Sequence, residues 1–115
     1  METKRLISSY DEINDTFVGK IDGKIRYCAD YNISDGIYLA LDSSKIPCSV
    51  FVDGASEVFN ISKDILEKSD VRISISCNSM HISLIMFIEG LKVCSIKCEN
   101  RCGIPEMDCL MDTNY

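Results

Sequence analysis

The sequence lacks any apolar run long enough to cross a membrane, since the longest, ISLIMFI, covers only Ile82 to Ile88. The N-terminal segment METKRLISSYDE has charges but no apolar stretch of the signal-peptide kind, so we expect no export signal. Basic residues are also scarce, because 12 Lys and Arg oppose 18 Asp and Glu and leave a formal net charge of −6. This balance disfavours direct contact with a nucleic-acid backbone. We therefore expect a cytoplasmic protein with neither a membrane nor a nucleic acid as a direct partner.

Common motifs of catalysis and cofactor binding are missing as well. The chain has no Gly-rich phosphate loop and no D-x-D-x-D-G calcium loop. Its single histidine, His81, has no protease signature nearby, and the closest candidate nucleophile is Cys77, across an expected turn. Carboxylates are plentiful, but most flank expected turns, where Asp bonds to nearby backbone N–H groups. We expect no catalytic residue, no cofactor and no enzymatic activity.

Cysteine, by contrast, is abundant. The chain has seven thiols, an odd number that argues mildly against a secreted, fully disulfide-paired protein. Without an export signal, the thiols are expected to be reduced and to behave as small, mostly buried apolar groups. They are Cys28, Cys48, Cys77, Cys94, Cys98, Cys102 and Cys109.

The evenly spaced Cys94, Cys98 and Cys102, together with Cys109, are weak candidates for a metal site. The segment LKVCSIKC favours a strand, in which residues four positions apart lie about 13 Å from each other. Two thiolates on one zinc ion lie within about 4 Å, so Cys94 and Cys98 cannot share an ion in a strand. Cys98 and Cys102 can approach if the chain reverses at Glu99-Asn100. A metal-binding or redox function of these cysteines remains the alternative hypothesis.

Alternating apolar and polar residues predict strands along most of the chain. The segment ASEVFNISKDILEKSD changes to helical spacing, and Ser62 is a plausible N-cap for a short helix from Ser62 to Lys68. Asp22-Gly23 suits a two-residue hairpin turn between the first two strands. The expected strands are Thr16–Ile21, Lys24–Tyr31, Gly36–Asp42, Pro47–Asp53, Val71–Cys77, Met80–Ile88 and Leu91–Cys98.

These segments predict one domain, residues 1–115, of the mainly β (α+β) class. Strands that follow one another without alternating helices favour antiparallel pairing. We expect two consecutive runs of antiparallel strands, four and then three, with one short helix between them. The acidic segment 99–115 has no clear period and is expected either to be an irregular or mobile tail or to add a short edge segment.

Such a sheet can leave an apolar face uncovered, because one short helix cannot cover both sides. An uncovered apolar face pairs with another copy of the chain or with a partner protein. Phe17, Tyr27, Tyr38 and Phe51 are the candidates for this face, and the alternative is that they belong to the core.

Two segments of the N-terminal half share a pattern, YDEINDTFVGKI, from Tyr10, and DGIYLALDSSKIPCSVFVDGAS, to Ser56. They contain Tyr-Asp, an Asp before the first strand, an Asp-Gly, two hairpin strands and an Ala-Ser at the exit. In this pattern the N-terminal half resembles a small bacterial β-rich domain family of unknown function. The chain departs from this pattern by inserting DGKIRYCADYNIS and by adding a second run of strands. The resemblance implies a β-rich fold over Tyr10 to Ser56 and no catalytic residue.

The leading functional hypothesis is a non-enzymatic protein-interaction or regulatory module that binds a protein partner, forms a homo-oligomer, or both. One version is an acidic inhibitor of a nucleic-acid-binding protein, of the antitoxin or phage counter-defence type. Such an inhibitor can be acidic because it occupies a groove that otherwise binds nucleic acid.

Overall fold

The computed structural model describes residues 2–115 and is mainly β, with 58% of residues in strands and 9% in helices. This confirms the predicted class. The elements are β1 (Glu2–Asp11), β2 (Thr16–Ile21), β3 (Tyr27–Ser34), β4 (Ile37–Asp42), β5 (Pro47–Asp53), α1 (Ala55–Phe59), α2 (Lys63–Glu67), β6 (Val71–Cys77), β7 (His81–Ile88), β8 (Leu91–Glu99) and β9 (Met107–Asp112).

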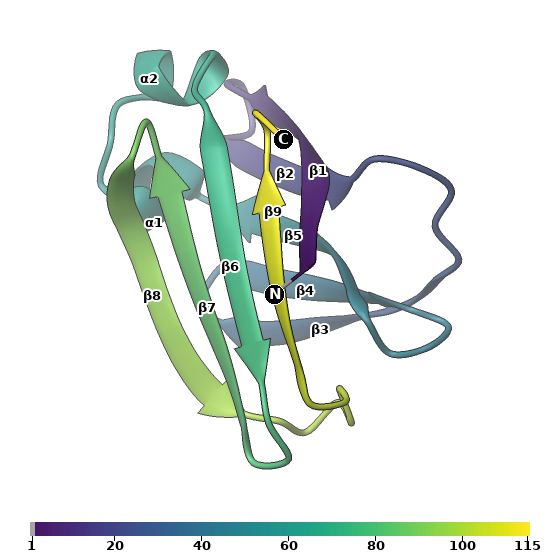
Figure 1. Ribbon diagram of the computed structural model, residues 1–115. Helices are drawn as coiled ribbons and strands as arrows, with labels where there is room; N and C mark the ends of the chain where they lie inside the picture. The colour runs from purple at the N-terminus through teal and green to yellow at the C-terminus, as the bar shows by residue number, and fades with distance from the viewer. Residues whose placement is uncertain (1) are drawn as a thin grey trace.

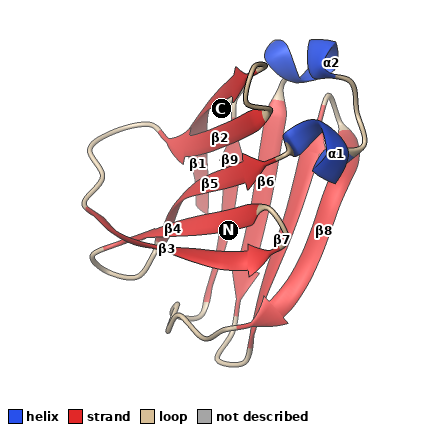
Figure 2. Ribbon diagram, turned by 180° about the vertical axis from the view of Figure 1, so that it is seen from behind, coloured by secondary structure: helices blue, strands red, loops and turns tan. Residues whose placement is uncertain are grey.

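The strands form one mixed sheet in the order β3-β4-β5-β2-β1-β9-β6-β7-β8, nearly closed into a barrel. It bends into two packed layers, which we call the β1–β5 layer and the β6–β9 layer (Figures 1 and 2). Strand β1 links them, because Glu2 to Arg5 pair in parallel with β9 while Leu6 to Asp11 pair antiparallel with β2. A strand that changes partners in this way is a usual corner between crossed sheets.

The core lies between the two layers and draws on every strand except β3 and β8 for its fully buried members. In β6 the alternation seen in the sequence is borne out, since Val71, Ile73 and Ile75 are buried and Arg72 is exposed. Gly19 on β2 leaves little room for a side chain on the core side. A Cβ atom there would lie 3.2 Å from the side chain of Leu6 and 3.3 Å from that of Ile73.

The expected arrangement of four and then three antiparallel strands is not confirmed, and the Asp22-Gly23 hairpin is wrong. Strand β2 pairs with β1 and β5, while β3 pairs with β4. Residues 22–26 therefore connect two strands that are not neighbours in the sheet, β2 and β3, and are called the crossover loop. The physical reason is β1, which was not expected as a strand. Its segment ETKRLISSYD buries Leu6 but otherwise lacks a clean apolar alternation.

The expected irregular tail is corrected for residues 107–112. These form β9, which is inserted between β1 and β6 and buries Cys109 and Met111. Its sequence, MDCLMD, is too short and too acidic to stand out by period alone. Residues 100–106 do form a loop without helix or strand, and this loop buries Ile104.

Two short helices replace the single expected one. The predicted helix corresponds to α2, with Ser62 at its N-cap, and α1 was missed. Helix α1 follows Gly54, whose φ of 69° lies in the left-handed region that favours glycine. Both helices lie at the same end of the molecule (Figure 2). No helix in residues 2–115 has the length and apolar content needed to cross a membrane.

Candidate binding groove

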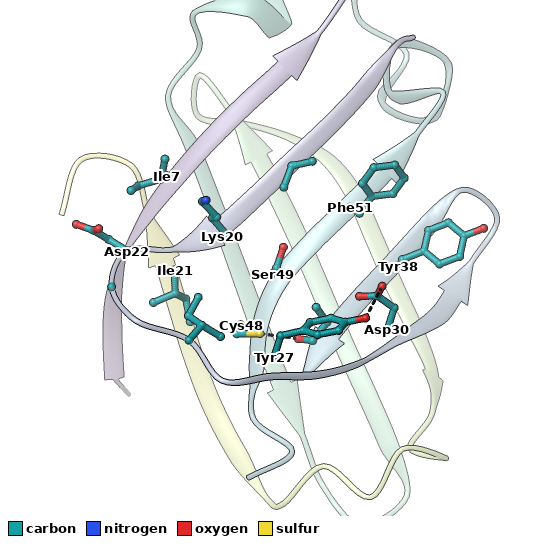
Figure 3. Close-up of a pocket in the computed structure, with 14 residues that line it drawn as sticks. Ile7, Lys20, Ile21, Asp22, Tyr27, Asp30, Tyr38, Cys48, Ser49 and Phe51 are labelled. Atoms are coloured by element: carbon teal, nitrogen blue, oxygen red, sulfur yellow. Dashed lines mark hydrogen bonds between the residues drawn. The ribbon is translucent and has the colours of Figure 1, made fainter. Parts of the chain in front are cut away.

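A groove of about 730 Å³ lies on the outer face of the β1–β5 layer, the face turned away from the core. Strands β2, β4 and β5 supply its floor, and the crossover loop forms a wall on one side (Figure 3). The side chains of Tyr38 and Phe51 stand on the other side (Figure 3). A concave and largely apolar surface with a few polar groups is the usual form of a binding site.

The strand register explains the shape of the floor. Ala40 on β4 is paired with Asp30 on β3 and with Ser49 on β5. Lys20 on β2 is paired with Ser49 and, on its other side, with Ile7 on β1. Directly paired residues point to the same side of a sheet, so these five form one row across the strands, here called the floor row. Its middle is low because Ala40 and Ser49 are short.

An aromatic row runs beside the floor row. In it, Phe51 is paired with both Tyr38 and Val18. The rings of Tyr38 and Phe51 meet edge to face, with centroids 5.9 Å apart and planes at 61°. Tyr38 is 37% exposed and Phe51 is 38% exposed. An edge-to-face aromatic pair on an outer face adds stable apolar area that the core does not use.

The floor row contains two opposite charges, Asp30 on β3 and Lys20 on β2. At the β3 end, Asp30 accepts a hydrogen bond of 2.8 Å from the Tyr27 hydroxyl, and this bond raises the pKa of Tyr27. On β2, Lys20 has no ion pair among residues 2–115. Asp22, in the wall, lies 3.9 Å from the Arg5 guanidinium, which offsets its charge. The groove is thus acidic and aromatic at one end and basic and aliphatic at the other.

The structure brings together three of the four aromatic residues proposed for an uncovered face. Tyr27, Tyr38 and Phe51 all line the groove. Phe17 does not, because it is 1% exposed and packs in the core against Phe59. Sequence reasoning missed Lys20, which enters the groove through the pairing of β2 with β5, and Ile7, which enters it through the pairing of β1 with β2.

The candidate metal ligands Cys94 and Cys98 both lie in β8, the strand that the segment LKVCSIKC predicted. Cys94 is paired with Met86 and Cys98 with Ile82, so both point toward the core side of the sheet. After Glu99 the chain turns, and the Asn100 side chain closes the loop by donating to the Ile104 carbonyl at 2.8 Å and accepting from the Ile104 backbone N–H at 3.1 Å. This turn brings Cys102 back, and Cys98 and Cys102 line one cavity of about 420 Å³.

The candidate Cys109 lies in β9, buried beside the same end of the core. Burial, followed by the nearby thiols of Cys98 and Cys102, raises the pKa of Cys77 to about 11. Burial also raises the pKa values of Cys94, Cys98 and Cys102. Within residues 2–115, no group of three or more His, Cys, Asp or Glu side chains is arranged to hold a metal ion.

His81 and Cys77 do not form a nucleophilic pair. Cys77 is paired with Ile82 and is buried on the core side, so the preceding residue of β7, His81, points to the other side of the sheet. Successive side chains of a strand alternate between faces, which is why a short sequence distance does not bring them together.

Tyr10, Asp15 and Ser56 form a small hydrogen-bonded cluster, here called the polar lock. The Asp15 carboxylate accepts from the Tyr10 hydroxyl at 2.6 Å, the Ser56 hydroxyl at 2.6 Å and the Ser56 backbone N–H at 3.0 Å. Burial alone would raise the pKa of Asp15, but these hydrogen bonds outweigh it and lower the pKa. The polar lock connects the β1–β2 turn to the start of α1. We assign it a structural role, because the Asp15 carboxylate already accepts hydrogen bonds from Tyr10 and Ser56.

Comparisons with known proteins leave the groove to be interpreted from its own geometry. No protein-family model matches the chain, and no curated protein or solved structure does either.

Proposed function

We propose that the chain is a non-enzymatic protein-interaction module whose docking surface is the groove of the β1–β5 layer. The observation that carries this proposal is the exposed aromatic pair Tyr38 and Phe51 beside a small-residue floor. A partner that covers these rings removes apolar area from water, which stabilises the complex by roughly 25 cal/mol per Å² before the costs of association.

The finer version of this proposal is an acidic inhibitor of a nucleic-acid-binding protein. It is supported by the net charge of −6, because an acidic chain is attracted to the basic surface of such a partner. Long-range attraction of this kind acts mainly on the association rate and weakens with salt. A partner bound at the groove with a strong salt dependence of the association rate is the expected signature.

A second candidate, a cysteine-based metal-binding or redox protein, is favoured by one observation. The turn after Glu99 brings Cys98 and Cys102 to the same cavity. Elemental analysis of the purified protein, together with thiol titration, tests it. Stoichiometric zinc or iron supports this candidate, and seven free thiols without metal contradict it.

Site-specific photo-crosslinking in the native host tests the docking proposal. A photoreactive benzoylphenylalanine replaces Phe51 in one variant and Leu91 in the control, because Leu91 is 63% exposed and lies at the far turn between β7 and β8. We expect a polypeptide adduct at position 51 and none at position 91. The absence of any polypeptide adduct at position 51, with the variant folded, contradicts the proposal.

A further inference from the structure

We propose that the groove binds an extended polypeptide segment with a basic residue at one position, an apolar residue two positions on and an acidic residue four positions on. This inference rests on the proposed function and states the chemistry of the partner. The basic side chain pairs with Asp30, the apolar one fills the low middle of the floor row, and the acidic one pairs with Lys20.

The spacing of the two charges selects this occupant. Asp30 and Lys20 lie on β3 and β2, with β4 and β5 between them. Three strand spacings separate them by about 14 Å, so they cannot pair with each other. In an extended peptide, residues four positions apart lie about 13 Å from each other and point to the same side. One peptide can therefore meet both charges at once.

The acidic end of the groove combines a carboxylate with aromatic rings, a combination that favours a cation. Asp30 is held by the Tyr27 hydroxyl at 2.8 Å, which fixes the direction of the carboxylate. Tyr27 and Tyr38 flank Asp30 (Figure 3). Aromatic rings beside a carboxylate favour a guanidinium, which can stack on a ring and donate hydrogen bonds at the same time. We therefore expect arginine rather than lysine at the basic position.

The middle of the floor row is shaped for a branched apolar side chain. Ala40 and Ser49 leave a depression between the aromatic row and the crossover loop. A second copy of the chain fits this surface poorly. Pairing its Lys20 with Asp30 across a two-fold axis places small floor residues against small floor residues and rings against rings. A peptide side chain enters the depression directly.

A set of three capped peptides tests the charge pattern: Arg-Thr-Leu-Thr-Glu, Arg-Thr-Leu-Thr-Arg and Glu-Thr-Leu-Thr-Glu. Binding is followed by nuclear magnetic resonance shifts of β2 to β5, at a salt concentration that screens the net charge. The wild-type protein is expected to bind the first peptide about threefold to tenfold more tightly than the other two.

Charge-reversal variants give the sharper result. Lys20→Asp makes both ends acidic and should prefer the peptide with two arginines, whereas Asp30→Lys makes both ends basic and should prefer the peptide with two glutamates. Tyr27→Phe controls for the hydrogen bond that Asp30→Lys also removes. Lys20→Gln and Asp30→Asn, which should reduce the preference without reversing it, serve if a reversal variant fails to fold.

The inference is overturned if the three peptides bind wild type equally, or if their order is the same in all variants. It is also overturned if light scattering shows a dimer whose dissociation by Phe51→Asp identifies a second copy as the occupant. A crosslink at position 51 to a folded partner, combined with no charge order among the peptides, overturns this inference alone and leaves the proposed function standing.

Discussion

The outer faces of the two layers differ although their inner faces share one core. The β6–β9 layer turns Arg72, Ser74 and Ser76 of β6 outward, and the apolar residues paired with them, Ile85, Phe87 and Leu110, are only partly exposed. The β1–β5 layer turns Tyr38 and Phe51 outward, where each is just over a third exposed. Folding requires only the inner faces to be apolar. The outward aromatic row is therefore apolar area beyond what the core needs, and this excess points to binding.

The largest expected effect on the free energy of unfolding comes from substitutions on the inner face of a layer, compared with substitutions on an outer face. Ile73→Ala, on the inner face of β6, should lower the free energy of unfolding by about 2–5 kcal/mol, because Ile73 is 0% exposed and its loss leaves a cavity. Phe51→Ala, on the outer face of β5, should cost less than about 1.5 kcal/mol despite removing more atoms. Urea denaturation with a common m-value measures both. Similar costs at the two sites would show that the aromatic row is part of the core.

The fold was predictable from the sequence where one face alone is buried. The segment VRISISC alternates strictly, and β6 has the bounds that this pattern predicts. Strand pairing between distant segments was not predictable from local pattern. Nothing local in ETKRLISSYD or MDCLMD shows that these two segments pair in parallel and join the layers. Without β1, Asp22-Gly23 looks like a hairpin, since Gly23 does adopt a positive φ of 121° within a longer loop.

The candidate site was predictable in kind but not in detail. Exposed aromatic residues on a half-covered sheet were expected, and Tyr27, Tyr38 and Phe51 meet in the groove. The charges of the groove depend on strand order, because Lys20 and Asp30 enter one row only through β4 and β5. For the cysteines, strand spacing alone separated Cys94 from Cys98, but the turn after Glu99 required the structure.

An intermediate effect concerns how the β1–β5 layer is tied to α1. Asp15→Asn should lower the free energy of unfolding by about 1–3 kcal/mol at pH 7, since the polar lock loses its charged acceptor. Asparagine is the matched change because Asp15 has a φ of 53°, which Asn tolerates. Tyr10→Phe, which removes one donor only, should cost less.

The contribution of Asp15 to stability should depend on pH. Folding lowers the pKa of Asp15 below its ordinary 3.8. The ionised carboxylate therefore stabilises the folded state above that pH, and this contribution is lost as the pH falls through the lower, folded value. Thermal unfolding of Asp15→Asn should accordingly change less than that of wild type between pH 5 and pH 2, a range estimated from the ordinary carboxylate pKa of about 4. Parallel profiles would show that Asp15 is not held ionised by the lock.

The smallest effect on stability is expected for substitution of an exposed thiol. The accessibility of the thiols also differs between the two layers. Cys28, on the edge strand β3, is exposed, whereas Cys77 and Cys109 in the β6–β9 layer are buried. At pH 8, Ellman's reagent should modify Cys28 first, and Cys77 only on unfolding, because a pKa of about 11 leaves roughly one thiolate in a thousand. Cys28→Ser should remove the fast phase and change stability by less than about 0.5 kcal/mol. If Cys98 or Cys102 reacted faster than Cys28, their thiols would be activated rather than suppressed, and the redox alternative would gain over the binding groove.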